Sequence, residues 1–279
     1  MSKSRTKLQK IQDVIPQKSI VIFSPHFDDV LFGLGGYLLE LKASGFFAEK
    51  NFHILLLFSL SNYQMGSGAG NNDTSLERIK LATGNRVIED AGCLDQLLGE
   101  HNYRYELLGE RECLLRSKQL AQTGLEFPHG MYRDFQEDDW QIFGRMQKLV
   151  ERWAAQEDTA LVFPLAIKEH IDHFIIREAA ITTARMLGEQ ARAKFYFQED
   201  KPYAGLQTPE EEARIHQFVE QNHLERCLYR SHPDEIIELG FQHYLSQVED
   251  IYRTGIRQRS EQLMAQFHLT EACDQIFRL

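Results

Sequence analysis

Short apolar runs alternate with longer amphipathic segments over the first two thirds of the chain. Apolar side chains recur at helical spacing in 30–44 and in 138–156, between runs that have the length and composition of strands covered on both faces. These runs are SIVIFSP (19–25), NFHILLLFSLS (51–61), YRYELLG (103–109) and TALVFPL (159–165). Strands separated by helices predict an α/β fold with a mainly parallel, Rossmann-like sheet flanked by helices.

The pattern changes after YFQEDKPYAG (196–205), where the strand-like runs stop. Thr208, Pro209 and Glu211 then have the features of a helix start: an N-cap, a proline at the first helical position and an acid three residues after the cap. The remaining pattern is helical. We therefore expect a lead segment (1–17), an α/β domain (18–205) and an α-helical C-terminal extension (206–279) packed on that domain.

Polar clusters follow two of the predicted strands. SPHFDDV (24–30) places a histidine and two adjacent aspartates after the first strand, and HIDHF (170–174) follows the strand LVFPL at the start of a helical pattern. Ligand sites of open α/β sheets form outside the carboxyl ends of the strands, so the two clusters are expected to meet there. His26, Asp29 and His173 would supply two imidazoles and a carboxylate, a set that suits a catalytic zinc with an open position, and Asp28 would remain unligated beside it.

Each cluster also has a purely structural interpretation. The H-x-x-D stretch could be a helix cap beside a surface histidine, and Asp172 could be only the N-cap of its helix. The glycines of GLGG (33–36) lack the G-x-G-x-x-G spacing of a nucleotide site, so we interpret them as packing residues. The small and polar residues of 62–75 are compatible with a mobile lid or with a solvated loop.

Composition narrows the functional classes. The 279 residues are 43% hydrophobic, and 31 basic against 41 acidic side chains give a formal charge of −10, which argues against nucleic acid or an anionic membrane as the main partner. The sequence shows no signal-peptide pattern and no apolar run long enough to span a bilayer, so a cytoplasmic location is expected. The four cysteines form no C-x-x-C pair and are expected to be reduced and structural.

The two polar motifs, PHFDD and HIDH, give the sequence a family resemblance. In this order they resemble the H-P-D-D and H-x-D-H motifs of the LmbE-like (PIG-L) family of zinc-dependent N-acetylglucosaminyl de-N-acetylases. Further similarities are RVIED (86–90), EDKPYA (199–204) and YLSQ (244–247), so that the resemblance extends over roughly residues 18–250. Phe27 departs from the usual proline and Val30 from a position that is often glutamate, which puts the substrate preference in doubt.

The resemblance implies a role for each motif residue. His26, Asp29 and His173 become ligands of zinc, or of a substitute such as iron(II), and Asp28 becomes the general base for a metal-activated water. His170 would stabilise the oxyanion, and either Asp28 or His170 would protonate the leaving amine. Asp172 would orient one metal-binding histidine. Arg86 would contact substrate hydroxyls or phosphate, unless it only forms a helix-surface salt bridge with Glu89 or Asp90.

The expected activity is hydrolysis of an N-acetyl group from an amino-sugar-containing small molecule or glycoconjugate. Three alternatives remain at this point. The same fold could cleave a non-sugar amide, because Phe27 and the segment 116–138 leave the pocket undefined, or it could bind sugars without catalysis. Two histidines and one carboxylate also form the facial triad of non-haem iron oxygenases, although such triads usually occur on an all-β scaffold.

Overall fold

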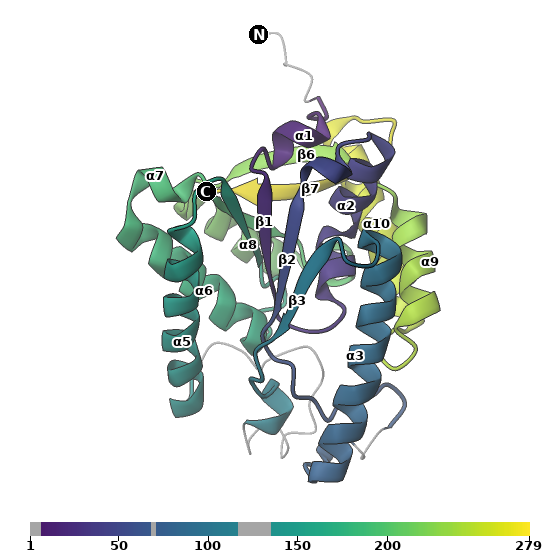
Figure 1. Ribbon diagram of the computed structural model, residues 1–279. Coiled ribbons are helices and arrows are strands. Elements are labelled where there is room, and N and C mark those ends of the chain that lie inside the picture. Colours follow the sequence, from purple (N-terminus) through teal and green to yellow (C-terminus); the bar gives the residue numbers. More distant parts are fainter. Residues whose placement is uncertain (1–6, 68–70, 117–134) are drawn as a thin grey trace.

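The computed structural model describes residues 7–67, 71–116 and 135–279, and in this part of the chain a seven-stranded sheet forms the centre (Figure 1). The strand order is β3-β2-β1-β4-β5-β7-β6. The first five strands in this order are parallel, and β7 is antiparallel to both of its neighbours. The strands are β1 (Ser19–Ser24), β2 (Asn51–Leu56), β3 (Tyr103–Leu107), β4 (Thr159–Pro164), β5 (Phe195–Gln198), β6 (Glu225–Arg230) and β7 (Cys273–Arg278).

Both faces of the sheet are buried, which explains why its central strands are almost continuously apolar. In β1, Ile20 and Ile22 belong to one hydrophobic core, whereas Val21 and Phe23 belong to the other. Successive side chains of a strand point to opposite faces, so this short run contributes to two cores at once. The predicted α/β fold with a mainly parallel sheet is therefore confirmed.

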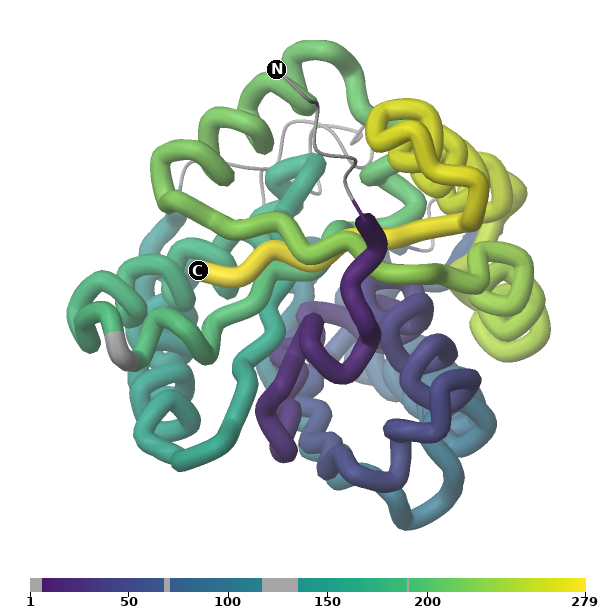
Figure 2. The backbone as a smooth tube through the Cα atoms, turned by 90° about the horizontal axis from the view of Figure 1, so that it is seen from above, coloured from purple at the N-terminus to yellow at the C-terminus, as the bar shows by residue number. Residues whose placement is uncertain are grey.

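Helices cover the sheet in two layers (Figures 1 and 2). The first core includes side chains of α1 (Ile11–Val14), α2 (Gly35–Ala43), α3 (Leu76–Leu98), α9 (Pro233–His243) and α10 (Asp250–Phe267). The second includes side chains of α5 (Glu137–Ala154), α6 (Ile171–Leu187) and α8 (Pro209–Gln221). A short helix, α7 (Glu189–Arg192), precedes β5. No helix within the described ranges combines the length and the apolar character that crossing a membrane requires.

The segment after residue 205 differs from the expectation in one respect. The expected helical character is present in α8, α9 and α10, and α8 begins as predicted, with the Thr208 side chain accepting a hydrogen bond from the Glu211 amide. The expectation that strands stop there is wrong, because β6 and β7 extend the sheet and β7 lies between β5 and β6. Both strands carry charged or amide side chains in their interior, such as Arg226 and Asp274, and these residues obscure the apolar pattern of a strand.

A π-helical turn, Val30–Leu34, connects the Asp28–Asp29 pair to α2. The glycines of this region allow close packing, as the sequence suggested. A Cβ atom on Gly33 would lie 2.2 Å from the Gln198 side chain of β5, and one on Gly36 would lie 2.8 Å from Asp274 of β7. A side chain at Gly33 would displace the Gln198 amide, and one at Gly36 would displace the side chains of Ser231 and Asp274. π-Helical turns are frequent at functional sites.

Candidate active site

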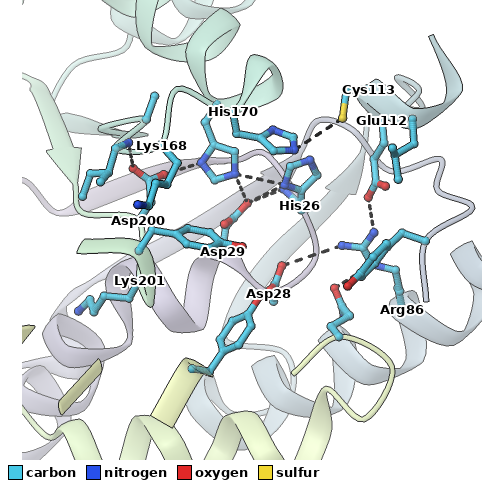
Figure 3. Close-up of a pocket in the computed structure, with 18 residues that line it drawn as sticks. His26, Asp28, Asp29, Arg86, Glu112, Cys113, Lys168, His170, Asp200 and Lys201 are labelled. Atoms are coloured by element: carbon cyan, nitrogen blue, oxygen red, sulfur yellow. Dashed lines mark hydrogen bonds and ion pairs between the residues drawn. The ribbon is translucent and has the colours of Figure 1, made fainter. Parts of the chain in front are cut away.

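The two polar motifs meet at the carboxyl ends of adjacent strands. β1 pairs with β4 in parallel, so the loop after β1 and the start of α6 after β4 lie side by side. His26, Asp28 and Asp29 from the first and His170 and His173 from the second line a single pocket (Figure 3). The structure thus brings the sequence-predicted site residues of both motifs together.

Three ligand atoms of this pocket form a compact triangle. His26 Nδ1 lies 3.2 Å from His173 Nε2, and Asp29 Oδ2 lies 3.4 Å from each of these nitrogens. Atoms bound to one tetrahedral zinc at its usual bond lengths of about 2.0–2.1 Å are separated by about 3.3 Å. The triangle therefore has the dimensions of a three-ligand metal site with one open position.

Carboxylates orient both imidazoles of the triangle. His26 Nε2 lies 2.9 Å from Asp172 Oδ2, and His173 Nδ1 lies 2.5 Å from Asp200 Oδ1. Each ring can donate a proton to its carboxylate and direct its other nitrogen at the centre, which is the arrangement that metal-binding histidines usually have. Asp172 is not the N-cap of α6, because His170 occupies that position.

The charges around the triangle favour a cation. Burial alone would lower the pKa of His26, but hydrogen bonds with Asp172 and Asp29 raise this pKa to about 10. Burial likewise opposes the ionisation of Asp29, whereas His173 and His26 lower its pKa to about 2. The two histidines and the carboxylate therefore favour positive charge at their centre, and a divalent metal fits both the donor set and the electrostatics.

Asp28 and Asp29 are neighbours in sequence but have different surroundings. Burial and the Asp29 charge raise the pKa of Asp28, so its carboxylate is the more basic of the two. The Tyr252 hydroxyl of α10 donates a hydrogen bond to Asp28 Oδ2 at 3.2 Å, and Arg86 Nη2 lies 4.0 Å from Oδ1. The Asp28 carboxylate therefore lies outside the ligand triangle but in the same pocket, on the side of Arg86 (Figure 3).

His170 is held as a neutral hydrogen-bond donor. Its Nδ1 accepts the Asp172 amide at 3.3 Å, which leaves the proton of the neutral ring on Nε2. Burial lowers the pKa of His170 to about 3. An imidazole that protonates a leaving amine must first be charged, whereas these surroundings favour the neutral form of His170.

Arg86 lies under the pocket rather than on the helix surface. Its Nη1 donates to Ser61 Oγ at 2.8 Å and pairs with Glu112, its Nε donates to Gln247 Oε1 at 2.8 Å, and the guanidinium covers the Phe27 ring. Its partners are thus neither Glu89 nor Asp90. Phe27 is fully buried beneath Arg86, so the departure from the family motif acts on the pocket through this packing.

The residues that surround Arg86 explain two of the secondary motifs. Glu89 of RVIED accepts hydrogen bonds from the Ser246 amide and hydroxyl at 2.7 Å, and Asp90 accepts the Tyr244 hydroxyl at 2.7 Å. RVIED on α3 and YLSQ after α9 therefore bind each other directly, far apart as they are in the sequence.

Sequence reasoning missed several residues of the pocket. Asp200 was quoted only as part of EDKPYA, and Gln247 only as part of YLSQ. Tyr203 likewise lies within EDKPYA. The pocket is also lined by four residues that belong to none of the motifs, Tyr63, Glu112, Cys113 and Tyr252. The segment 62–75, for which the sequence allowed a lid or a solvated loop, contributes Tyr63 to the pocket. Most of the segment 116–138 lies outside the described residues.

Comparison with known proteins shows that the fold of this chain is similar to that of several solved structures. No family model matches the chain. One curated protein, spectrin beta chain, non-erythrocytic 5, from Homo sapiens, is 37% identical over 83 residues, which are 28% of this chain and 2% of that protein, so the chain spans a very small part of its length. The similarity to solved structures, in contrast, extends over nearly the whole chain.

The zinc-inhibited form of teicoplanin deacetylase Orf2 matches 93% of this chain and 97% of its own, with a TM-score of 0.62 and 18% identity. A40926 pseudoaglycone deacetylase Dbv21 matches 94% of this chain and 97% of its own, with a TM-score of 0.57 and 17% identity. N,N'-diacetylchitobiose deacetylase from Pyrococcus horikoshii matches 98% of this chain and 86% of its own, with a TM-score of 0.54 and 14% identity. These three structural neighbours are deacetylases, and the chain has their fold.

Proposed function

We propose that this protein is a metal-dependent hydrolase that removes an N-acetyl group from an amino-sugar-containing substrate. The observation that carries the proposal is the triangle of His26 Nδ1, Asp29 Oδ2 and His173 Nε2, with the more basic carboxylate of Asp28 in the same pocket. The fold shared with teicoplanin and diacetylchitobiose deacetylases supports it. Zinc is the proposed metal, with iron(II) as a substitute, and a cytoplasmic location remains a prediction.

A divalent metal held by His26, Asp29 and His173 would polarise the substrate carbonyl and acidify a water molecule. Asp28 would take the proton from this water as it attacks the amide carbon, and Tyr252 would hold the Asp28 carboxylate in place through its 3.2 Å hydrogen bond. His170 Nε2–H would donate a hydrogen bond to the oxygen on which negative charge develops.

The leaving amine must receive a proton before the C–N bond breaks. The sequence allowed either Asp28 or His170 as the donor. Because His170 is a neutral ring whose Nδ1 accepts a backbone amide, it has no second proton to give. We therefore assign this step to Asp28, which would return the proton that it took from water.

The cations of the pocket favour a substrate with neutral hydroxyl groups over a phosphate. Lys168 pairs with Glu211, Lys201 with Asp274 and Arg86 with Glu112. Each positive charge at the described pocket wall is thus compensated by a carboxylate. The tyrosine rings and hydroxyls of the wall suit a sugar, and the proposed role of Arg86 is to hold the wall and to meet a substrate hydroxyl.

The decisive experiment is a panel of N-acetylated amino sugars, glycoconjugates and small acyl-amides, incubated with the zinc-loaded protein. Acetate release together with a new primary amine on the sugars supports the proposal. Cleavage of non-sugar amides alone would assign the same chemistry to another substrate class, and sugar binding without turnover would show a non-catalytic relative. Oxygen consumption coupled to turnover would revive the oxygenase alternative, for which this α/β sheet is an unusual scaffold.

A further inference from the structure

Five polar side chains, four of them buried and Arg259 partly buried, form a cluster beside the pocket, where β5, β7 and α10 meet. Arg259 of α10 makes a bidentate ion pair with Glu199, through Nε at 2.8 Å and Nη2 at 2.5 Å. Gln275 of β7 donates to the same carboxylate at 2.6 Å, and Lys201 pairs with Asp274 of β7. Glu199, Lys201, Asp274 and Gln275 are each 5% exposed or less.

Residues 199–201 divide their side chains between this cluster and the candidate metal site. Glu199 and Lys201 bind α10 and β7, whereas Asp200 between them binds His173 Nδ1 at 2.5 Å and accepts the Ile167 amide at 2.9 Å. In Figure 3 the side chains of Asp200 and Lys201 point in different directions from neighbouring positions. The backbone that carries Asp200 is thus fixed on both sides by ion pairs to the C-terminal elements.

The backbone of α10 also packs directly on this loop. A Cβ atom on Gly255 would lie 2.3 Å from the Pro202 carbonyl oxygen, and one on Gly205 would lie 1.9 Å from the Gly255 carbonyl oxygen. Such close contact leaves little freedom for one backbone to move without the other. A displacement of α10 would therefore be transmitted to the loop that contains Asp200.

Stability alone does not explain a buried charged cluster. Removing ions from water is costly, and well-packed apolar residues often stabilise a protein as much as a buried ion pair or more. The bidentate pair of Arg259 and Glu199 instead imposes a defined geometry on the chain. Carboxylates that orient metal-binding histidines set the metal affinity, and their loss typically weakens it about 10–100-fold.

We propose that the cluster of Glu199, Lys201, Arg259, Asp274 and Gln275 positions Asp200, and through Asp200 the imidazole of His173, so that α10 and β7 determine the metal affinity of the site. Arg259, Glu199 and Gln275, which do not line the pocket, are positioning residues that contact neither metal nor substrate. This inference rests on the proposed metal site.

The test compares two arginines of α10. Arg259→Gln removes the bidentate pair with Glu199, whereas the control Arg257→Gln removes an exposed pair with Asp234 at 2.8 Å. Zinc affinity is measured by competition with a chromophoric chelator, and the Co²⁺-loaded proteins are compared by absorption spectroscopy, on samples whose circular dichroism shows the native fold. We expect Arg259→Gln to lose about tenfold in affinity, at the low end of the range for orienting partners, with an altered Co²⁺ spectrum. Arg257→Gln should have the zinc affinity and the Co²⁺ spectrum of the wild type.

Each outcome is informative. Equal affinity and identical spectra for the wild type and Arg259→Gln would overturn the inference while leaving the proposed function intact. A wild-type protein that binds no metal would overturn both. Should Arg259→Gln fail to fold, Arg259→Lys provides the second variant, because it keeps the charge but cannot make both bonds to Glu199. It should lose part of the affinity, and wild-type affinity in this folded variant would count against the inference.

Discussion

Two adjacent carboxylates can have different chemical roles only if their surroundings differ. Asp29 faces His26 and His173, whereas Asp28 faces Tyr252 and Arg86. Burial and the Asp29 charge raise the pKa of Asp28, whereas His173 and His26 overcome the effect of burial at Asp29 and lower its pKa. Substitution at each position should therefore give a distinct phenotype.

Asp28→Asn keeps the size of the side chain and removes its basicity. We expect this variant to retain its metal and to bind substrate, while kcat falls by about 10²–10⁴-fold, the usual contribution of a positioned general base. Metal analysis of the purified variant and steady-state kinetics on the same sample measure both properties. Loss of the metal would contradict the assignment of Asp28 as base rather than ligand.

Asp29→Ala removes one corner of the ligand triangle. We expect metal affinity and activity to fall together, and excess zinc to restore part of the activity, because His26 and His173 remain. Titration of the apo-protein with zinc, followed by a chelating dye, gives the affinity. Full metal occupancy with normal turnover would show that Asp29 is not a ligand.

At the scale of elements, α3 is attached to the C-terminal part of the chain by a buried acid. Asp90 accepts hydroxyl hydrogen bonds from Tyr105 of β3 and from Tyr244, the C-cap of α9. Burial raises the pKa of Asp90 to about 8 although both hydroxyls oppose this shift. The folded protein therefore binds a proton at Asp90 that the unfolded chain releases near pH 4.

This proton makes stability fall as pH rises. An acid whose pKa is raised in the folded state gives its full contribution to the free energy of unfolding below its unfolded pKa. For Asp90 this contribution is lost progressively between about pH 4 and pH 8. Asp90→Asn removes the titration, so its free energy of unfolding relative to wild type should increase by about 2–3 kcal/mol from pH 5 to pH 7. Urea denaturation at several pH values measures this difference, and parallel pH profiles for the two proteins would contradict it.

The elements also show what could be predicted from the sequence. The strands β1, β2 and β4 were predictable because most of their side chains are buried on both faces of the sheet. The convergence of His26 with His173 followed from the parallel pairing of β1 with β4. β6 and β7 were not predictable, because they contain charged residues that interrupt the apolar pattern of a strand. Asp274, for example, is buried in β7 and is compensated by Lys201. The role of Asp200 was equally hidden, since one aspartate in a loop gives no sign of which imidazole it will face.

For the molecule as a whole, metal should act as a stabilising ligand. A metal that binds the native state alone stabilises it by RT ln(1 + [L]/Kd), which is about 4 kcal/mol at a thousandfold excess over Kd. We expect a chelator to abolish activity and to lower the melting temperature, and added zinc to restore both. Calorimetry with and without the chelator measures the shift. Activity and melting temperature that do not respond to the chelator would exclude a metal-dependent enzyme.

The position of β7 has a consequence for how the protein is made. β6 joins the sheet only through β7, and β7 follows β6 by more than forty residues, including α9 and α10. During synthesis, β5 therefore presents an open strand edge, and β6 has no partner until residues 273–278 have left the ribosome. Open edges of this kind are prone to pair with other chains. Nascent chains that stop short of β7 should thus depend on chaperones more strongly than full-length ones.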